Sequence, residues 1–300
     1  MRRLELYAAV PTTVAAIEWC KTKGLLMREV RCQVCNSFMK LAQDNCLDGQ
    51  IWRCRKTING QRHERKTSIR QNSFFSGSHL SIKELLYIIY EWAANMGVEQ
   101  TSFELDIGTI SVMKIFKSLR ETAGSLLNQN ADNQIGGYGI IVEIDECQIG
   151  RRKHHRGRVP REIWVFGALE RNSRPIRGFI EIVESRDQDT LCSIIQRRIN
   201  DRSRIISDGW RAYTHLQELG FSHSVVNHSQ NFVSPNDSTV YTQNVENLWR
   251  CLRRFLNSKG TYTRRHLQEY LDEFMFRKGS VDVFETVVSA LEEKLVFIEQ

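Results

Sequence analysis

Three acidic residues in the second half of the chain stand where their carboxylates can meet. Asp145 ends a short β-branched run, Asp208 directly follows another, and Glu246 lies in an amphipathic segment. Hard divalent cations bind carboxylate oxygens, and two such ions held ~3.5–4 Å apart stabilise both oxygens of a phosphoryl displacement. We therefore predict that these acids bind Mg²⁺ (or Mn²⁺) for phosphodiester chemistry. The alternative for Asp208, which precedes Gly209, is a turn or a helix cap.

Two further acids, Glu143 and Glu146, flank Asp145 and are rival metal ligands. Successive side chains of a strand point to opposite faces of a sheet. On that ground we expect both glutamates to face away from Asp145. Asp145 is therefore the ligand that we predict from this strand.

Cysteines are concentrated in one stretch of the first half of the chain. Four of the eight fall between residues 32 and 54, which indicates a metal site in a reducing compartment rather than a disulfide scaffold. Cys32 and Cys35 form a C-x₂-C pair, and Cys54 follows at a separation typical of a zinc ribbon. A second knuckle would need a cysteine at position 57, which is Thr57. The spacing predicts three ligands of a structural Zn²⁺ site, and the alternative is a decayed ribbon without metal.

Basic side chains are concentrated in three stretches of a chain whose formal net charge is +7. Residues 51–70, 151–163 and 250–265 are basic, whereas 271–300 is acidic. Three such stretches favour a polyanion, and we predict double-stranded DNA. The side chains expected to contact it are Arg151, Arg152, Lys153, Arg158, Arg253, Arg254 and Lys259. The alternative for any one stretch is a solvated helix face, and residues 151–158 are also typical of a nuclear-localisation signal.

The composition is that of a globular protein of about two domains, with 300 residues of which 41% are hydrophobic and 26% charged. No window approaches the ~18 consecutive apolar residues of a membrane span, and the amino terminus lacks the apolar run of a signal peptide. We therefore expect neither membrane contact nor a small-molecule substrate.

Helical periodicity surrounds the cysteine segment in the first half of the chain. A Thr cap and a glycine bound a short helix over 12–24, Ser81 begins a helix that Gly97 ends, and another helix spans about 112–127. The last two form either a helix-turn-helix or a plain helical bundle. The predicted domains are an N-terminal helical segment (1–27), a zinc-ribbon-like segment (28–75), a helical DNA-binding region (76–130), a catalytic domain (137–280) and a C-terminal acidic helix (281–300).

Short β-branched runs replace helical periodicity after the Asn/Asp/Gly-rich stretch 128–137, where we place a domain boundary. The predicted strands are 139–144, 162–170, 177–183, 204–207 and 223–226, and the predicted helices are 190–199, 212–219 and 243–256. This order, βββαβαβα, indicates an α/β fold with a ribonuclease H-like mixed sheet, its first strand central and its fourth and fifth parallel to the first. That sheet would bring Asp145 beside Asp208, with Glu246 reaching across from the last helix.

The motifs around these acids resemble those of one family in their order and in their residues. They are Val142–Glu146, Arg151–Lys153, Trp164–Gly167, Ile206–Tyr213, Val226–His228 and Thr242–Glu246. Over most of residues 15–280 the chain is similar to Merlin-type DDE transposases and to the related bacterial insertion-sequence transposases. The resemblance implies a ribonuclease H-like domain that cuts and joins DNA at element ends, with Asp145, Asp208 and Glu246 as its acidic triad. The chain departs from the family at Tyr241, where these transposases usually place His.

The same resemblance implies an N-terminal zinc-binding segment in which His63 is the fourth ligand and Cys46 its rival. By analogy it also implies a homo-oligomer that holds two element ends, located in the nucleus, or in the cytoplasm if the source is bacterial. One alternative is a domesticated DNA-binding protein that keeps the fold without transposing. Another is a cellular ribonuclease H-like nuclease, which does not explain the zinc-ribbon-like segment.

Overall fold

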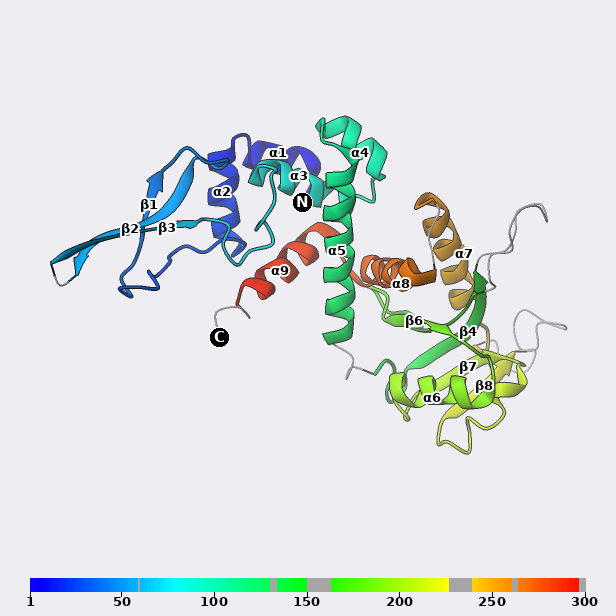
Figure 1. Ribbon diagram of the computed structural model, residues 1–300. Coiled ribbons are helices and arrows are strands. Elements are labelled where there is room, and N and C mark those ends of the chain that lie inside the picture. The colour runs from blue at the N-terminus through cyan, green and yellow to red at the C-terminus, as the bar shows by residue number, and fades with distance from the viewer. Residues whose placement is uncertain (59, 130–133, 150–162, 227–238, 261–263, 297–300) are drawn as a thin grey trace. The chain divides into compact units, whose positions relative to one another are not determined.

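The computed structural model describes residues 1–58, 60–129, 134–149, 163–226, 239–260 and 264–296, which fold into two compact units (Figure 1). Unit 1 contains Met1–Thr122 together with the C-terminal segment from Asp282, and unit 2 contains Ala123–Val281. The division falls inside one long helix, just before the stretch 128–137 where the sequence places a boundary. The C-terminal helix is part of unit 1 rather than a separate segment.

Capped helices form most of unit 1. The Thr12 hydroxyl accepts a hydrogen bond from Ala15 N at the start of one helix, and Ser81 and Glu84 form a capping box at the start of another. The helices are α1 (Arg3–Ala9), α2 (Thr13–Thr22), α3 (Ile82–Ala93), α4 (Val98–Leu105), α5 (Thr109–Gln129) and α9 (Val283–Val296). The predicted helices 12–24 and 112–127 correspond to α2 and α5.

The helix predicted to end at Gly97 ends earlier. Asn95 has a left-handed backbone conformation (φ 62°) just beyond α3, and Gly97 is instead the N-cap of α4. The short helix α4 therefore lies between the two helices that the sequence paired. The prediction of two consecutive helices joined by one turn is wrong, because this region is a series of three.

The cysteine segment of unit 1 contains a three-stranded antiparallel sheet with the strand order β1-β2-β3. Its strands are β1 (Lys40–Gln43), β2 (Gln50–Ile58) and β3 (Gln61–Ser68). The β2–β3 hairpin extends away from the helices of its unit (Figure 1). At its base the buried Arg70 guanidinium forms a bidentate pair with Asp48, at 2.5 and 2.6 Å, and donates to Ser78 O. This pair fixes the hairpin to the segment that leads into α3.

Unit 2 is built on a five-stranded mixed sheet with the order β6-β5-β4-β7-β8. Its strands are β4 (Ile141–Ile149), β5 (Ile163–Glu170), β6 (Gly178–Val183), β7 (Arg204–Asp208) and β8 (Ser222–Val226). β4 pairs antiparallel with β5 and parallel with β7, while β7 pairs parallel with β8. The first strand of the unit is therefore central, and the fourth and fifth are parallel to it, as the sequence predicts.

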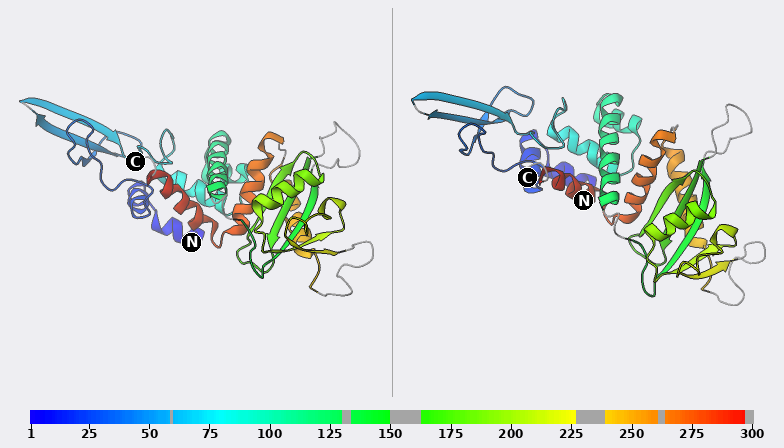
Figure 2. Two further views of the ribbon diagram at one scale, coloured as in Figure 1. Left: turned by 90° about the horizontal axis from the view of Figure 1, so that it is seen from below. Right: turned by 60° about the horizontal axis from the view of Figure 1, so that its bottom comes forward.

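Helices cover both faces of this sheet (Figure 2). Side chains from α6 (Gln188–Arg198) pack with Ile144 and Phe166 on one face. Side chains from α7 (Gln243–Ser258) and α8 (Arg264–Gly279) pack with Cys147 and Val165 on the other. The alternation of β5 residues between two cores explains why this strand is an almost continuous apolar run.

One predicted helix of unit 2 is wrong. Residues 212–219 form turns, with only a short 3₁₀ helix at Arg211–Tyr213. Ala212, Tyr213 and Leu216 are buried against the α6 face, so their spacing satisfies packing without a regular helix. No helix in the described part of the chain combines the length and apolar character needed to span a membrane.

Candidate metal centres

Asp145 and Asp208 lie at the same level on two neighbouring strands of unit 2. The parallel ladder between β4 and β7 pairs Glu143 with Ile206, and the two aspartates stand two residues further along their strands. Residues at matching levels of parallel strands point to the same face, so both carboxylates lie on the face that α7 covers. Because β4 continues to Ile149, Asp145 lies within its strand and not at the predicted end.

The Asp145 carboxylate is half-buried and held by two hydrogen bonds. Trp249 Nε1 donates to Oδ2 at 2.9 Å, and Glu146 N donates to Oδ1 at 2.8 Å. Burial, together with the nearby charges of Asp208 and Glu246, raises the pKa of Asp145 to about 6 against the lowering effect of Trp249. The predicted triad is therefore close enough for its members to interact electrostatically.

Trp249 reaches Asp145 because the facing strand carries a glycine. Gly167 pairs with Asp145 across the β4–β5 ladder, and a Cβ atom there would clash with the Trp249 indole. The sequence motifs include Gly167 without predicting a role for it, and they end before Trp249. The sequence signal for Trp249 was its place on the predicted amphipathic helix, one turn after the predicted ligand Glu246.

Glu246 lies in the first turn of α7, where Thr242 Oγ1 donates to its Oε1 at 3.2 Å. The helix packs on β4 and β5 through buried side chains that include Val245, Leu248 and Leu252. Its amphipathic pattern thus puts Glu246 at the edge of the packed face, within electrostatic range of Asp145.

The prediction that both flanking glutamates face away from Asp145 is wrong for Glu143. Residues two apart on a strand share a face, so Glu143 lies on the α7 side with Asp145, where it is fully buried. Glu146 does face the α6 side, and its carboxylate accepts a hydrogen bond from the Tyr213 hydroxyl. Burial, followed by the charges of Asp145 and Asp208, raises the pKa of Glu146 to about 8.

Asp208 also makes the turn that the sequence offers as its alternative role. Its Oδ1 accepts a hydrogen bond from Trp210 N at 3.0 Å, which shapes the chain beyond Gly209. The hydrogen bond from Trp210 N goes to Oδ1 of Asp208, and Asp208 stands beside Asp145. Shaping the turn is therefore compatible with binding a metal through the other carboxylate oxygen.

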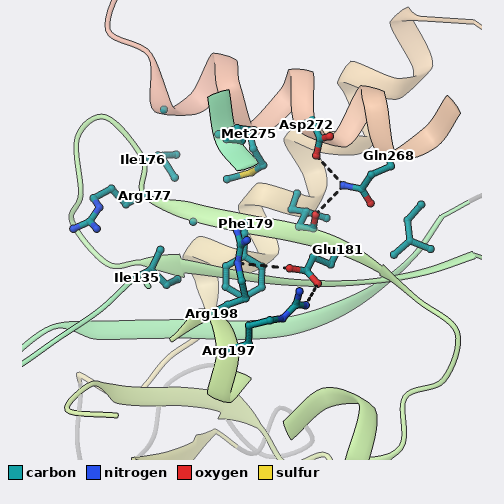
Figure 3. Close-up of a pocket in the computed structure, with 15 residues that line it drawn as sticks. Ile135, Ile176, Arg177, Phe179, Glu181, Arg197, Arg198, Gln268, Asp272 and Met275 are labelled. Carbon is teal, nitrogen blue, oxygen red and sulfur yellow. Dashed lines mark hydrogen bonds and ion pairs between the residues drawn. The ribbon is translucent and has the colours of Figure 1, made fainter. Parts of the chain in front are cut away.

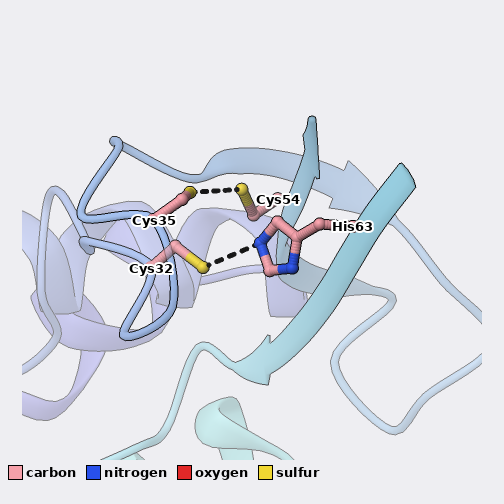
Figure 4. Close-up of side chains that lie close together, drawn as sticks. All are labelled: Cys32, Cys35, Cys54 and His63. Atoms are coloured by element: carbon pink, nitrogen blue, oxygen red, sulfur yellow. Dashed lines mark hydrogen bonds between the residues drawn. The ribbon is translucent and has the colours of Figure 1, made fainter. Parts of the chain in front are cut away.

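The four residues predicted for zinc converge in unit 1 (Figure 4). Ligand atoms of Cys32, Cys35, Cys54 and His63 all lie within 4.8 Å of one another. Cys32 Sγ is 3.2 Å from His63 Nε2, and Cys35 Sγ is 3.5 Å from Cys54 Sγ. Zn–S bonds of ~2.3 Å place tetrahedral sulfur ligands about 3.8 Å apart, so these spacings suit a four-coordinate ion.

Local structure explains how these ligands meet. Cys32 and Cys35 lie on a knuckle in which Asn36 N donates to Cys32 O and Asn36 has a positive φ of 52°. Cys54 is on β2 and His63 on β3, paired with Lys56, so the register puts their side chains on the same face of the hairpin. The fourth ligand, His63, thus comes from β3, which pairs with the strand that carries Cys54.

The thiols of this cluster differ in their protonation. Hydrogen bonding from Ser37 lowers the pKa of Cys35 to about 6, whereas burial raises the pKa of Cys54 to about 11. Cys46, the rival ligand, is outside the cluster: it is exposed, and its Sγ lies 3.5 Å from Gln50 O. The geometry therefore selects His63 as the fourth member.

The predicted DNA-contacting residues divide into three groups. Arg151, Arg152, Lys153 and Arg158 lie outside the described residues. Arg253 and Arg254 are exposed on α7, although Arg253 also donates to Cys147 Sγ at 2.9 Å. Lys259 is different, because its side chain is 13% exposed and its Nζ donates to the buried Glu273 at 2.9 Å. Its charge is thus engaged within unit 2.

A cavity of about 580 Å³ in unit 2 is separate from the predicted sites (Figure 3). It lies between β6, α6 and α8, and none of the predicted site residues lines it. Its charged side chains pair with one another, since Arg197 and Arg198 both contact Glu181. Gln268 Nε2 donates to Asp272 Oδ1 at 2.8 Å.

Comparisons with known proteins bear on the same part of the chain. Residues 135–279 match the family described as the ISXO2-like transposase domain. An uncharacterized transposase-like protein of Haemophilus influenzae is 26% identical over 102 residues, which cover 34% of this chain and 80% of that protein.

Two solved structures of Mos1 transposase assemblies are similar at a low level. A pre-cleavage Mos1 transpososome is 12% identical with a TM-score of 0.31, covering 71% of this chain and 76% of that one. A Mos1 paired-end complex with the left transposon end is 13% identical with a TM-score of 0.31, covering 70% and 75%.

The assignment rests on the sequence matches, and it agrees with the family type that the motifs predict. All three acids of the predicted triad fall within the matched segment. Residues 135–279 are therefore similar to the ISXO2-like transposase domain, and this similarity supports a DDE-type transposase.

Proposed function

We propose that this protein cuts and joins DNA at the ends of a mobile element, with Asp145, Asp208 and Glu246 holding Mg²⁺ or Mn²⁺. The observation that carries the proposal is that Asp145 and Asp208 stand at matching positions of β4 and β7, with Glu246 of α7 near enough for its charge to raise the pKa of Asp145. We assign the sheet to the ribonuclease H-like class on its strand order. Paired carboxylates on neighbouring parallel strands suit metal-assisted phosphodiester chemistry.

The donor set fits hard divalent cations. The three side chains offer only carboxylate oxygens, and mutual repulsion helps keep the pKa of Asp145 high. When bound, Mg²⁺ would supply an acidified water and neutralise charge that develops on the phosphate. Trp249 and Glu146 N orient Asp145, while Trp210 N orients Asp208.

Exposed arginines on α7 would hold the DNA backbone beside these acids. Arg250, Arg253 and Arg254 lie on the same helix as Glu246, within two to three turns of it. We extend the same role to the basic run 151–158, which also fits the nuclear location that the sequence suggests. Guanidinium groups suit this task because they bind phosphate oxygens in a fork geometry.

For unit 1 we propose that Cys32, Cys35, Cys54 and His63 bind one Zn²⁺. Four closely set protein ligands leave no open position, which is typical of structural zinc. The ion would tie the knuckle to the β2–β3 hairpin, which is rich in basic side chains.

The test uses the purified full chain and duplexes that carry the sequences flanking its gene, including any terminal inverted repeats. We expect Mg²⁺-dependent strand cleavage followed by joining to a target duplex, and loss of both with Glu246→Gln. DNA binding without cleavage by the wild-type chain would instead favour a domesticated DNA-binding protein. Sedimentation with end DNA would show whether two chains hold two ends, as the proposed oligomer requires.

A further inference from the structure

We propose that the buried Glu143 is a positioning residue that places Glu246 by capping the start of α7. The functional consequence of this inference rests on the proposed function, whereas the contacts that support it do not. Glu143 is on β4 with no exposed surface, two residues before Asp145 and on the same face. A carboxylate so completely buried needs partners that offset the cost of its desolvation.

Three of the four donor groups that bind Glu143 belong to the first turn of α7. Glu143 Oε2 accepts hydrogen bonds from Asn244 N at 2.9 Å and Val245 N at 3.1 Å, and Oε1 accepts one from Asn244 Nδ2 at 2.7 Å. The first N–H groups of a helix need acceptors, and a negative charge there is favoured by the helix dipole. A strand residue thus performs the task that an N-cap side chain usually performs, while Thr242 Oγ1 bonds Glu246 instead.

The remaining partner is Arg171, which also holds the chain leading into α7. Its Nε donates to Glu143 Oε1 at 2.7 Å, and its two terminal nitrogens donate to Thr239 O at 2.5 Å and Tyr241 O at 2.7 Å. Its guanidinium also stacks 3.8 Å from the centre of the Tyr241 ring. Tyr241 is therefore part of this anchor.

These contacts leave no room for Glu143 as a metal ligand. Two oxygens of a carboxylate offer about four acceptor sites, and four donors already occupy them. Asp145, by contrast, accepts one hydrogen bond on each oxygen. Glu143 therefore acts through α7 rather than on the ion.

Two attachments to β4 bracket Glu246. Glu143 binds the backbone of Asn244 and Val245 just before it, and Asp145 binds Trp249 just after it. Together they fix both the rotation of α7 about its axis and its height along β4. Removing the first attachment frees the turn that carries Glu246 while leaving the second in place.

The experiment measures Mn²⁺ affinity of the full chain in a double-mutant cycle of Glu143→Gln and Glu246→Gln. We expect Glu143→Gln to weaken Mn²⁺ binding about tenfold, as other supporting contacts of metal ligands do. In the Glu246→Gln background the same substitution should change the affinity less than about twofold, because its effect passes through Glu246. Equal weakening in both backgrounds would overturn the proposal.

Glu170→Gln is the matched control. Glu170 is also a buried glutamate, at the end of β5, and pairs with Arg177 at 3.1 Å, but it bonds Gly136 N rather than α7. We expect this variant to bind Mn²⁺ like the wild type, and an equal loss there would mean that any buried acid of the sheet has this effect.

Hydrogen exchange separates this inference from the proposed function, because it requires no activity. The amides of Asn244 and Val245 should exchange faster in Glu143→Gln, while those of the central turns of α7 keep their protection. The double variant Glu143→Gln/Arg171→Met removes the unpaired buried cation, so its stability should recover while Mn²⁺ affinity stays low. Unchanged exchange, or recovery of both properties, would contradict a positioning role even if the wild type cuts DNA.

Discussion

The thiol and imidazole cluster of unit 1 is assembled more completely than the acidic cluster of unit 2. All four ligand atoms of Cys32, Cys35, Cys54 and His63 lie within 4.8 Å of one another. Among the described residues, Asp145, Asp208 and Glu246 do not form such a group. The fold alone brings the Cys and His ligand atoms together, whereas the three carboxylates are less closely grouped.

Charge explains much of this difference. A thiol and a neutral imidazole can hydrogen-bond each other, as Cys32 and His63 do, so they approach without an ion. Carboxylates repel one another, and the charges of Asp208 and Glu246 add to the effect of burial in raising the pKa of Asp145. A closed set suits a structural ion, whereas an open set leaves positions for water and substrate. Unit 1 should thus need its metal to keep its shape, and unit 2 should need its metal only to react.

The largest expected effect concerns the acidic cluster of unit 2. Asp145→Asn keeps the side-chain shape and an acceptor for Trp249 but removes a metal-binding charge, so strand cleavage should fall by orders of magnitude. DNA affinity and the melting temperature should stay near their wild-type values. The exposed Asp189→Asn on α6 is the control for charge alone. Equal loss of DNA affinity in Asp145→Asn would make Asp145 a structural residue.

The next effect concerns shape in unit 1. The purified chain should contain one zinc, and Cys32→Ser should release it and speed proteolysis of residues 28–75 while unit 2 stays folded. Metal analysis and limited proteolysis check both points, with the exposed Cys46→Ser as control. If Cys46→Ser loses zinc and His63→Ala retains it, the fourth ligand is misassigned.

A smaller effect comes from the hydrogen bond between Trp249 and Asp145. This bond lowers the pKa of Asp145 against the raising effect of burial. Trp249→Phe should therefore raise that pKa further above about 6, and a protonated carboxyl binds metal poorly. We expect the acid limb of Mn²⁺ binding to move to higher pH, with recovery in alkaline buffer. Trp164→Phe, whose indole stacks on Arg186, should leave the pH profile in place.

The smallest effect is on the pH dependence of unit 2 stability. Burial lowers the pKa of His223, whose Nε2 lies 2.8 Å from Ser207 Oγ beside Asp208. The unfolded chain takes up a proton near pH ~6.5, before the folded chain does. The contribution of His223 to stability is therefore complete above that pH and is lost as pH falls through the lower folded pKa. Denaturant unfolding at pH 7.5 and 5 should show a smaller difference in His223→Gln than in the control His215→Gln.

Sequence reasoning found the ligands whose placement depends on local spacing or on strand order. The C-x₂-C pair specifies its own knuckle, and the order of strands brings Asp145 beside Asp208. It put Glu143 on the wrong face of the sheet, because alternation was applied to both flanking acids as if each were one residue from Asp145. It also gave no role to Gly167, since only the packed position of an indole from another element explains that glycine.

Helix boundaries depended on details that spacing does not encode. Gly97 has the residue type of a helix stop, yet the left-handed residue after α3 is Asn95. The apolar residues of 212–219 have helical spacing, but turns bury them equally well against α6. Tertiary packing, rather than local propensity, decided both cases.

The most direct test measures both metals in both ligand variants, by determining zinc content and Mn²⁺ affinity in Cys32→Ser and Asp145→Asn. The account predicts that Cys32→Ser loses zinc and still binds Mn²⁺ like the wild type, and that Asp145→Asn keeps its zinc while Mn²⁺ binding is lost. Loss of zinc from Asp145→Asn, or loss of Mn²⁺ binding from Cys32→Ser, would contradict two independent metal centres of different kinds.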